Sequence, residues 1–399
     1  MNARSTCLLF ALVVGTTCMP INPAWAQVPA HDSSVTVRFA SFNVAMNRRN
    51  AGDLKNELTS GESTKTQKIA EIIQRVRPDV LLVNEFDYDE AGEGLKAFQE
   101  KFLGVSQNDQ KPIEYPHVYF GPVNTGEDSG IDLNLDGRHL MPRDGFGFGY
   151  FPGQYALAVL SKYPMDREKV RTFQRFLWKD MPDAKLPIDT ASKQPYYPDH
   201  VMEVFRLSSK SHWDIPIIVG EQRIHFLVSH PTPPVFDGDE DANGCRNHDE
   251  IRLFADYVSG KADYLYDDAG NRGGLPAGSH FVIAGDLNAD PKDGASRDNA
   301  VRLLTEHPLI NDTNPSSQGG VYYSKEQGKA NMDHKGDPAS DTGDFNDQNV
   351  GNMRIDYALP SKNLTVSDSG VFWPKPDQPG GDLVEASDHR LVWVDLKKN

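Results

Sequence analysis

The chain has 399 residues, of which 25% are charged, and a formal net charge of −16 at pH 7. A surface this acidic does not trap polyanions, which argues against tight, non-specific binding of nucleic acid. It does not exclude a nuclease that uses a divalent cation as its local positive charge. The length permits one large domain or two ordinary ones. Because no low-complexity linker or internal repeat divides the chain, we expect a single domain with long loops over residues 27–399.

The first 26 residues are typical of a secretory signal peptide. Arg4 provides the positive charge, residues 7–14 are apolar, and residues 24–26 (Ala-Trp-Ala) suit a cleavage site. We therefore expect a secreted or periplasmic protein. Removal of the segment, whose only charged residue is Arg4, lowers the net charge from −16 to −17 and leaves Cys245 as the last cysteine. The apolar run is too short to span a bilayer comfortably, so we expect no stable membrane insertion, and no obligate protein partner is evident.

Two predicted strands near the N-terminus end in polar side chains. Residues 35–44 alternate apolar and polar positions, as a half-buried strand does, and Asn43 stands at the end of the pattern. An amphipathic helix is predicted at residues 66–77, followed by a fully apolar strand at residues 80–83 and then Glu85. This order of strand, helix and strand indicates an α/β layered fold.

The remaining chain predicts further strands, one helix and two long polar loops. The loops cover residues 124–151 and 311–352, and His212 is expected in a loop between two paired strands. The helix is expected at residues 249–257. The further strands are expected at residues 115–121, 154–161, 201–207, 215–219, 224–228, 281–284, 353–359, 371–373 and 391–394.

The strand at residues 281–284 leads into Gly285, Asp286 and Asn288. Positions two apart in an extended segment point to the same side, so the two polar side chains would face whatever lies at the strand end. Ligands usually bind at strand ends in α/β folds. The alternative is an ordinary turn, because Asp, Asn and Gly favour turns.

Three more chemically active residues occupy comparable places. His230 follows the predicted strand at residues 224–228, Asp356 lies inside a predicted strand, and Asp388-His389 precede the last strand. A carboxylate within a strand needs a partner.

One segment matches the full pattern of a calcium-binding loop. Asp239, Asp241, Asn243 and Glu250 have the spacing that places four oxygen ligands around one Ca²⁺, and residues 132–137 repeat half of the pattern. The alternative for the full pattern is a polar loop in which Asn247 caps the following helix. A structural Ca²⁺ ion is thus one expectation.

Taken in order, these motifs resemble the endonuclease/exonuclease/phosphatase superfamily, which includes pancreatic-type deoxyribonucleases and abasic-site endonucleases. The match runs from about Val35 to Leu396. It rests on Phe42-Asn43, Asn84-Glu85, Ser229-His230, Gly285-Asp286-Leu287-Asn288, Arg354-Ile355-Asp356-Tyr357 and Ser387-Asp388-His389. The resemblance implies a four-layer α/β sandwich, in which two mostly antiparallel sheets are flanked by helices.

The resemblance also implies roles for these residues. Glu85 would be the main metal ligand, with Asn43 and Asp388 nearby, and the ion would be Mg²⁺ or Mn²⁺. The remaining roles are catalytic: Asp286 would orient or deprotonate the attacking water, Asn288 would donate to a phosphoryl oxygen, His389 would contact the phosphate with Asp356 orienting its ring, and His230 would protonate the leaving group. No counterpart is found for the carboxylate that pairs with the histidine at the place of His230 in pancreatic-type nucleases.

The sequence therefore predicts an exported, divalent-metal-dependent phosphoester hydrolase, most readily a phosphodiesterase or nuclease acting on nucleic acid. One alternative on the same fold is a phosphomonoesterase or a sphingomyelinase-like hydrolase of phospholipid head groups, which the acidic surface favours. A more distant alternative is a non-catalytic binding module.

Overall fold

The computed structural model describes residues 28, 29 and 31–398, so the predicted signal peptide lies outside the described residues. The first of its two large sheets has the order β12-β13-β1-β2-β4-β3. Its neighbouring strands are antiparallel except β1 and β2. The strands are β1 (Thr36–Met46), β2 (Val80–Phe86), β3 (His117–Phe120), β4 (Leu157–Ser161), β12 (Val366–Val371) and β13 (Val392–Lys397).

The second sheet has the order β11-β8-β7-β6-β5, and its one parallel pair is β7 and β8. Two short strands, β9 (Gly343–Asp344) and β10 (Asn352–Met353), pair separately. The members of the second sheet are β5 (Arg171–Thr172), β6 (His212–Val219), β7 (Gln222–Ser229), β8 (His280–Asp286) and β11 (Asp356–Pro360).

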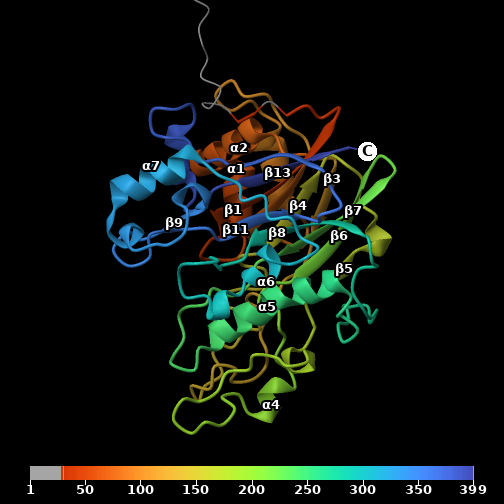
Figure 1. The fold of residues 1–399 in the computed structure, drawn as a ribbon, viewed down its shortest axis with the longest axis vertical. Helices are drawn as coiled ribbons and strands as arrows, with labels where there is room; N and C mark the ends of the chain where they lie inside the picture. The colour runs from red at the N-terminus through yellow and green to blue at the C-terminus, as the bar shows by residue number, and fades with distance from the viewer. Residues whose placement is uncertain (1–27, 30, 399) are drawn as a thin grey trace, which may run out of the picture.

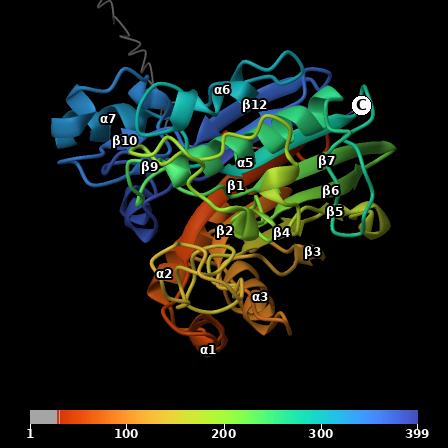
Figure 2. The same ribbon diagram turned by 90° about the horizontal axis from the view of Figure 1, so that it is seen from below.

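Helices cover the outer face of each sheet. One hydrophobic core joins α1, α2 and α3 to the first sheet, a second lies between the sheets, and a third joins α5 and α6 to the second sheet. Figures 1 and 2 show these helix layers on opposite sides of the paired sheets. The expected four-layer α/β sandwich is confirmed. The helices are α1 (Asp53–Ser60), α2 (Thr64–Val76), α3 (Glu93–Phe98), α4 (Asp199–Met202), α5 (Ala242–Ser259), α6 (Arg302–Thr305) and α7 (Gln318–Gln327).

Helix α2 shows how local sequence builds one layer. The Ser63 side chain caps the helix by accepting a hydrogen bond from the backbone N–H of Thr66. Its apolar stripe, which includes Ile69 and Ile73, is buried against the first sheet. Arg77 then adopts a left-handed conformation that ends the helix before β2.

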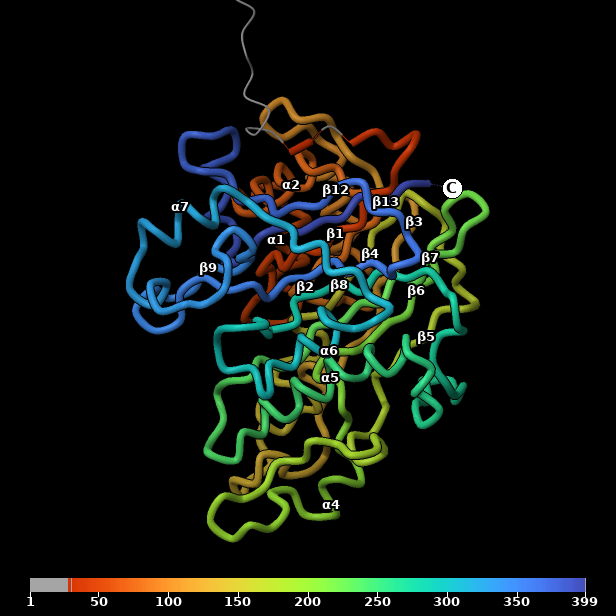
Figure 3. Tube along the Cα trace, in the orientation of Figure 1, coloured from red at the N-terminus to blue at the C-terminus, as the bar shows by residue number. Residues whose placement is uncertain are grey.

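The order of strands brings distant parts of the chain together. Strand β13 lies beside β1, so the last strand returns to the first, as Figure 3 traces. The parallel pairs β1–β2 and β7–β8 each direct two strand ends to the same edge. Those two edges meet, because the Asn43 side chain at the end of β1 bonds the Asp286 carboxylate at the end of β8.

Several predicted elements need correction. The strand predicted at residues 201–207 was wrong: α4 begins after Pro198 and ends at Met202, residues 203–207 form no strand, and Val201, Met202 and Phe205 are buried in the core outside the second sheet. His212 begins β6 instead of lying in a loop. The predicted helix at 249–257 is the C-terminal half of α5. In the described part of the chain, no helix has the length and apolar character needed to cross a membrane.

Candidate active site

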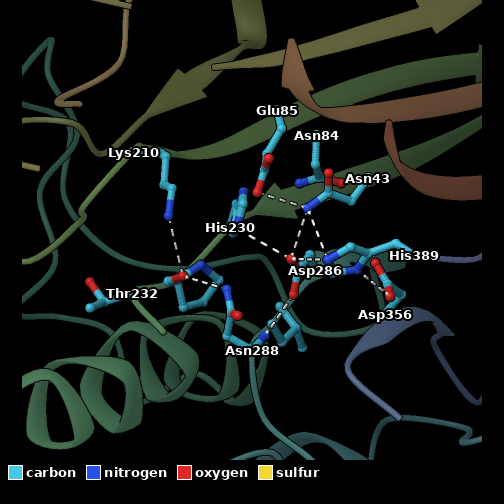
Figure 4. A network of polar contacts seen from close by, with 12 residues as sticks. Asn43, Asn84, Glu85, Lys210, His230, Thr232, Asp286, Asn288, Asp356 and His389 are labelled. Atoms are coloured by element: carbon cyan, nitrogen blue, oxygen red, sulfur yellow. Dashed lines mark hydrogen bonds and ion pairs between the residues drawn. The ribbon is translucent and has the colours of Figure 1, made fainter. Parts of the chain in front are cut away.

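Asp286, the last residue of β8, lies at the centre of the site (Figure 4). One carboxylate oxygen, Oδ1, accepts a hydrogen bond from the backbone N–H of Asn288 at 2.9 Å, which forms the expected turn. The other oxygen, Oδ2, faces the side chains of neighbouring strands. The turn expected for this segment is confirmed, and it leaves the second oxygen facing the candidate site, while the catalytic role of Asp286 stays a prediction.

Gly285 allows β7 and β8 to approach closely just before this carboxylate. Its φ is +156°, and a Cβ atom there would lie 2.0 Å from the carbonyl oxygen of Ser229. Only glycine tolerates that contact. The close approach places His230 beside Asp286, with Nε2 3.3 Å from Oδ2.

Asn43 and Glu85 reach the site from the parallel pair β1–β2. The register of this pair shifts after Asn43, and Glu85 has a left-handed φ of 57° that departs from regular strand geometry. The Asn43 Nδ2 group donates to Glu85 Oε1 at 3.1 Å and to Asp286 Oδ2 at 3.0 Å. Its Oδ1 accepts from the N–H of Ala45. The amide nitrogen therefore joins the two carboxylates.

The antiparallel register of β8 and β11 places Asp356 directly opposite Asp286. Two buried carboxylates at opposite positions repel each other, and His389 lies between them. Its Nδ1 is 2.9 Å from Asp356 Oδ2, and its Nε2 is 3.6 Å from Asp286 Oδ2. Burial alone would lower the pKa of His389, but the two carboxylates outweigh that effect and raise it well above its usual value.

Hydroxyl groups hold this His–carboxylate pair in place. Ser387 Oγ donates to the carbonyl oxygen of Asn43 at 2.7 Å and accepts from the N–H of His389. Thr342 Oγ1 accepts from the N–H of Asp356 at 2.9 Å. The C-terminal Ser-Asp-His segment is thereby tied to β1, which explains its place before the last strand.

The opposite side of the site contains polar atoms without partners. Within the described chain, His230 Nδ1 and Thr232 Oγ1 are buried and have no hydrogen-bond partner. Burial lowers the pKa of His230 well below its usual value, so the ring is neutral at neutral pH. Lys210 also reaches into this side, and its amine is 3.5 Å from the carbonyl oxygen of Pro231. No sequence motif includes Lys210, which precedes β6.

The donor atoms suit a hard divalent cation. Glu85, His230 and Asp286 each offer one ligand atom within 4.8 Å of the others, and Asp286, Asp356 and His389 form a second such group. One oxygen of Asp356 is buried without a hydrogen-bond partner among the described residues. The carboxylate oxygens of these groups are ligands that Mg²⁺ and Mn²⁺ accept, and no thiolate is among the donors. Glu85 and Asp286, which share the Asn43 bridge, are the residues that would hold such an ion.

Two predicted site residues lie differently from the others. The Asp388 side chain is exposed and belongs to neither group of candidate ligands. Asn288 has a left-handed φ of 51°, and its Nδ2 donates to the carbonyl oxygen of Pro231 at 3.1 Å. Asn288 therefore lies on the same side of the site as Lys210.

The predicted calcium loop does not form. Helix α5 begins at Ala242, so Asn243 and Glu250 lie on one helix, and Asn247 is inside the helix instead of capping it. The Glu250 carboxylate is buried and accepts from the backbone N–H groups of Ser209 and Thr232, both at 2.6 Å. The remaining members, Asp239 and Asp241, lie in the turn before α5, where Asp241 pairs with Arg297. The four side chains are therefore not brought together.

Comparison with known proteins identifies a family. The model of the Endonuclease/Exonuclease/phosphatase family matches residues 40–389. No curated protein sequence matches the chain.

Solved structures with low sequence identity also match. An endonuclease/exonuclease/phosphatase from Beutenbergia cavernae DSM 12333 is 17% identical and has a TM-score of 0.48, with 91% of this chain and 72% of that chain covered. TDP2 from Caenorhabditis elegans is 15% identical with a TM-score of 0.44, covering 91% and 74%. Beta toxin from Staphylococcus aureus is 16% identical with a TM-score of 0.43, covering 90% and 99%.

Proposed function

Since the chain belongs to the endonuclease/exonuclease/phosphatase family, whose members are generally metal-dependent phosphoester hydrolases, we propose that it hydrolyses phosphodiesters with the aid of a divalent cation. Nucleic acid is the first substrate class to test. The observation that carries the proposal is the convergence on Asp286 Oδ2. Asn43, His230 and His389 reach this one oxygen from three other parts of the fold.

The side chains divide the chemistry among them. Asp286 holds and deprotonates the attacking water with the oxygen that the turn leaves free. His389, oriented by Asp356, donates its Nε2–H to a phosphoryl oxygen. A hard divalent cation at Glu85 and Asp286 would supply Lewis-acid stabilisation of the developing charge. Asn288 adds a neutral donor on the opposite side.

The proton donor to the leaving group is the least determined role. His230 was predicted for it, and a low pKa leaves the ring neutral. A neutral ring is a weak general acid. The Nε2 of His230 lies 3.3 Å from Asp286, so the ring also helps to position that carboxylate. The general-acid role of His230 stays a prediction.

The net charge of −16 supports a second candidate, a phosphomonoesterase or a hydrolase of phospholipid head groups. Such substrates carry fewer charges than nucleic acid and lose less affinity on an acidic surface. The substrate class is therefore decided by comparing esters of different kinds.

Export is part of the proposal and rests on the pattern of residues 1–26. Expression of the full chain in a bacterial host, followed by N-terminal sequencing of the secreted or periplasmic fraction, tests it. A new terminus at Gln27 is the expected result. A chain that keeps Met1 and stays in the cytoplasm would contradict export.

The activity is tested by incubating the purified protein with plasmid DNA, bis-p-nitrophenyl phosphate and p-nitrophenyl phosphate, in Mg²⁺, Mn²⁺, Ca²⁺ or EDTA. We expect cleavage of DNA or of the diester that EDTA abolishes. Turnover of the monoester alone would replace the diesterase by a phosphatase. If the folded protein cleaves none of the three esters, sphingomyelin vesicles are the next substrate. If sphingomyelin is not cleaved either, the proposed hydrolase activity is overturned.

A further inference from the structure

We propose that Lys210 is the cation that binds a non-bridging oxygen of the substrate phosphoryl group, on the side of the site opposite His389. The inference deepens the proposed function and rests on it for the identity of the bound group. Phosphoryl binding on that side is thereby assigned to Lys210, a residue that belongs to none of the sequence motifs.

Lys210 has a buried amine without an ion-pair partner among the described residues. Its exposed fraction is 7%, and no carboxylate of the described residues lies within ion-pairing distance of its amine. Burial lowers the pKa of this amine, and the charges of Glu250, Glu85 and Asp286 act against that effect. The one contact of Nζ is to the carbonyl oxygen of Pro231, at 3.5 Å, the long limit for a hydrogen bond. Burial of an unpaired ammonium is unfavourable. An anion that arrives with the substrate would offset that cost.

The amine lies beside a second donor. Asn288 Nδ2 is 3.1 Å from the same carbonyl oxygen of Pro231, so the two groups flank one acceptor. Figure 4 shows Lys210 and Asn288 approaching it from opposite directions, with His230 between them and the carboxylates of Glu85 and Asp286. Two donors around one acceptor can bind two oxygens of one tetrahedral phosphoryl group, and an ammonium binds phosphate as a point charge.

The backbone around Lys210 is held from two sides. Glu250 of α5 accepts hydrogen bonds from the N–H groups of Ser209 and Thr232, which ties the segment before β6 to the segment after β7. The N–H of Asn124 donates to the carbonyl oxygen of Lys210 at 2.8 Å. Gly147 touches Ser209 so closely that a Cβ would lie 2.0 Å from its carbonyl oxygen. This rigid support is what an oxyanion-binding group requires, because preorganised donors need no rearrangement during the reaction.

A second lysine near the carboxylates does not have these properties. Lys65 donates its amine to the carbonyl oxygen of Ala45 and is only partly buried. Its charge therefore already has an acceptor and contact with solvent. Lys210 is the better candidate for binding the substrate.

The test compares Lys210→Met, which keeps the length of the side chain without its charge, with Lys210→Arg and with Lys96→Met. Lys96 is a matched control because its side chain is 72% exposed on α3. In hydrolysis of bis-p-nitrophenyl phosphate with Mn²⁺, we expect kcat/KM of Lys210→Met to fall about 10²–10³-fold, as for removal of one oxyanion donor. Lys210→Arg should recover part of the loss, and Lys96→Met should equal the wild type.

A readout of folding separates binding from structure. The Tm of Lys210→Met should equal or exceed that of the wild type, because the substitution removes a buried charge. Equal kcat/KM in Lys210→Met and the wild type would overturn the inference while the proposed function stood. A loss of activity accompanied by a lower Tm that Lys210→Arg does not restore would assign Lys210 a structural role and overturn it too.

Binding of inorganic phosphate, followed by ³¹P NMR line broadening in the presence of Mg²⁺, tests the contact without turnover. We expect Lys210→Met, and Lys210→Gln if the methionine variant does not fold, to weaken phosphate binding at least about tenfold, as for loss of a charge-assisted hydrogen bond. Equal binding in the wild type and the variant would overturn the inference. If the wild type hydrolyses no ester yet binds phosphate through Lys210, the proposed function fails and the binding site stands.

Discussion

The two sides of the site differ in how many of their buried polar groups have partners within the protein. On the His389 side, each ring nitrogen faces a carboxylate and the hydroxyl of Ser387 ties the segment to β1, while one oxygen of Asp356 has no partner among the described residues. On the Lys210 side, the Lys210 amine has one long hydrogen bond, to the carbonyl oxygen of Pro231. His230 Nδ1 and Thr232 Oγ1 have no hydrogen-bond partner within the described chain.

This difference indicates which side orients the reacting groups and which side binds the substrate phosphoryl group. Buried polar groups are normally paired, and unpartnered groups that face a candidate site can accept or donate to a ligand. The His389 side is a preorganised unit that positions a proton and a water. The Lys210 side has spare donors, among them the buried Lys210 amine, which suits the incoming phosphoryl oxygens.

Among variants that keep both Lys210 and Asp286, Asp356→Asn should have the largest effect, because it removes the charge that fixes the His389 ring and raises its pKa. We expect kcat for bis-p-nitrophenyl phosphate to fall about 100-fold with little change in KM, as for other partners of catalytic imidazoles. Asp312→Asn, which alters a carboxylate bound by Arg354, is the control and should leave kcat unchanged. Equal rates for Asp356→Asn and the wild type would show that Asp356 does not orient the His389 ring.

Glu250→Gln should weaken the support of the backbone segments that carry Lys210 and Thr232. The amide keeps one acceptor but presents N–H groups to a backbone donor, so one of the two bonds to Ser209 and Thr232 is lost. We expect the free energy of unfolding in urea to fall about 2–3 kcal/mol, with a smaller loss of kcat/KM than Lys210→Met shows. Glu203→Gln, at an exposed carboxylate, is the control. Unchanged stability would show that Glu250 does not hold the two segments.

His212 adds a pH dependence to the same side. Burial lowers its pKa from 6.5 to about 4, so the folded protein binds fewer protons than the unfolded chain between these values. The stabilisation is present above pH 6.5 and is lost as pH falls towards 4, by about 2 kcal/mol at pH 4.5. Urea unfolding of the wild type and His212→Asn at pH 7 and pH 4.5 measures it. The same decline in both proteins would exclude His212 as its source.

The smallest effect is expected at the calcium-like sequence before α5. Because Glu250 points to Ser209 and Thr232, Asp239 and Asp241 lack the partners that a Ca²⁺ site needs. We expect Asp239→Ala combined with Asp241→Ala to leave the dependence of Tm on Ca²⁺ unchanged. A rise of Tm with Ca²⁺ that is present in the wild type and absent from the double variant would contradict this account.

The sequence predicted the residues that end strands better than those that support them. Asn43, Glu85, His230 and Asp286 follow apolar runs, and that local pattern is visible without a structure. The close approach at Gly285 and the pairing of Asp356 with Asp286 depend on register between distant strands. Register of this kind has no local signature, so these features appear only in the fold.

Two failures have a common physical cause. The spacing from Asp239 to Glu250 matches a calcium loop, but residues 242–250 of this segment form the first turns of α5, and a buried face that includes Ile251 and Phe254 favours the helix. Residues 201–207 likewise offered apolar positions to a strand or a helix. In both places the local sequence is compatible with more than one conformation, and burial against the rest of the protein determines which one forms.

Metal-dependent turnover by Asp286→Asn tests the central claim most directly, because both candidate ligand groups and three neighbouring side chains share this carboxylate. Wild type and variant would be assayed with bis-p-nitrophenyl phosphate in Mn²⁺ and in EDTA, with circular dichroism to show equal folding. The account predicts wild-type turnover that EDTA abolishes and a loss of at least about 10³-fold in the variant. A folded Asp286→Asn protein that hydrolyses the diester at the wild-type rate would contradict it.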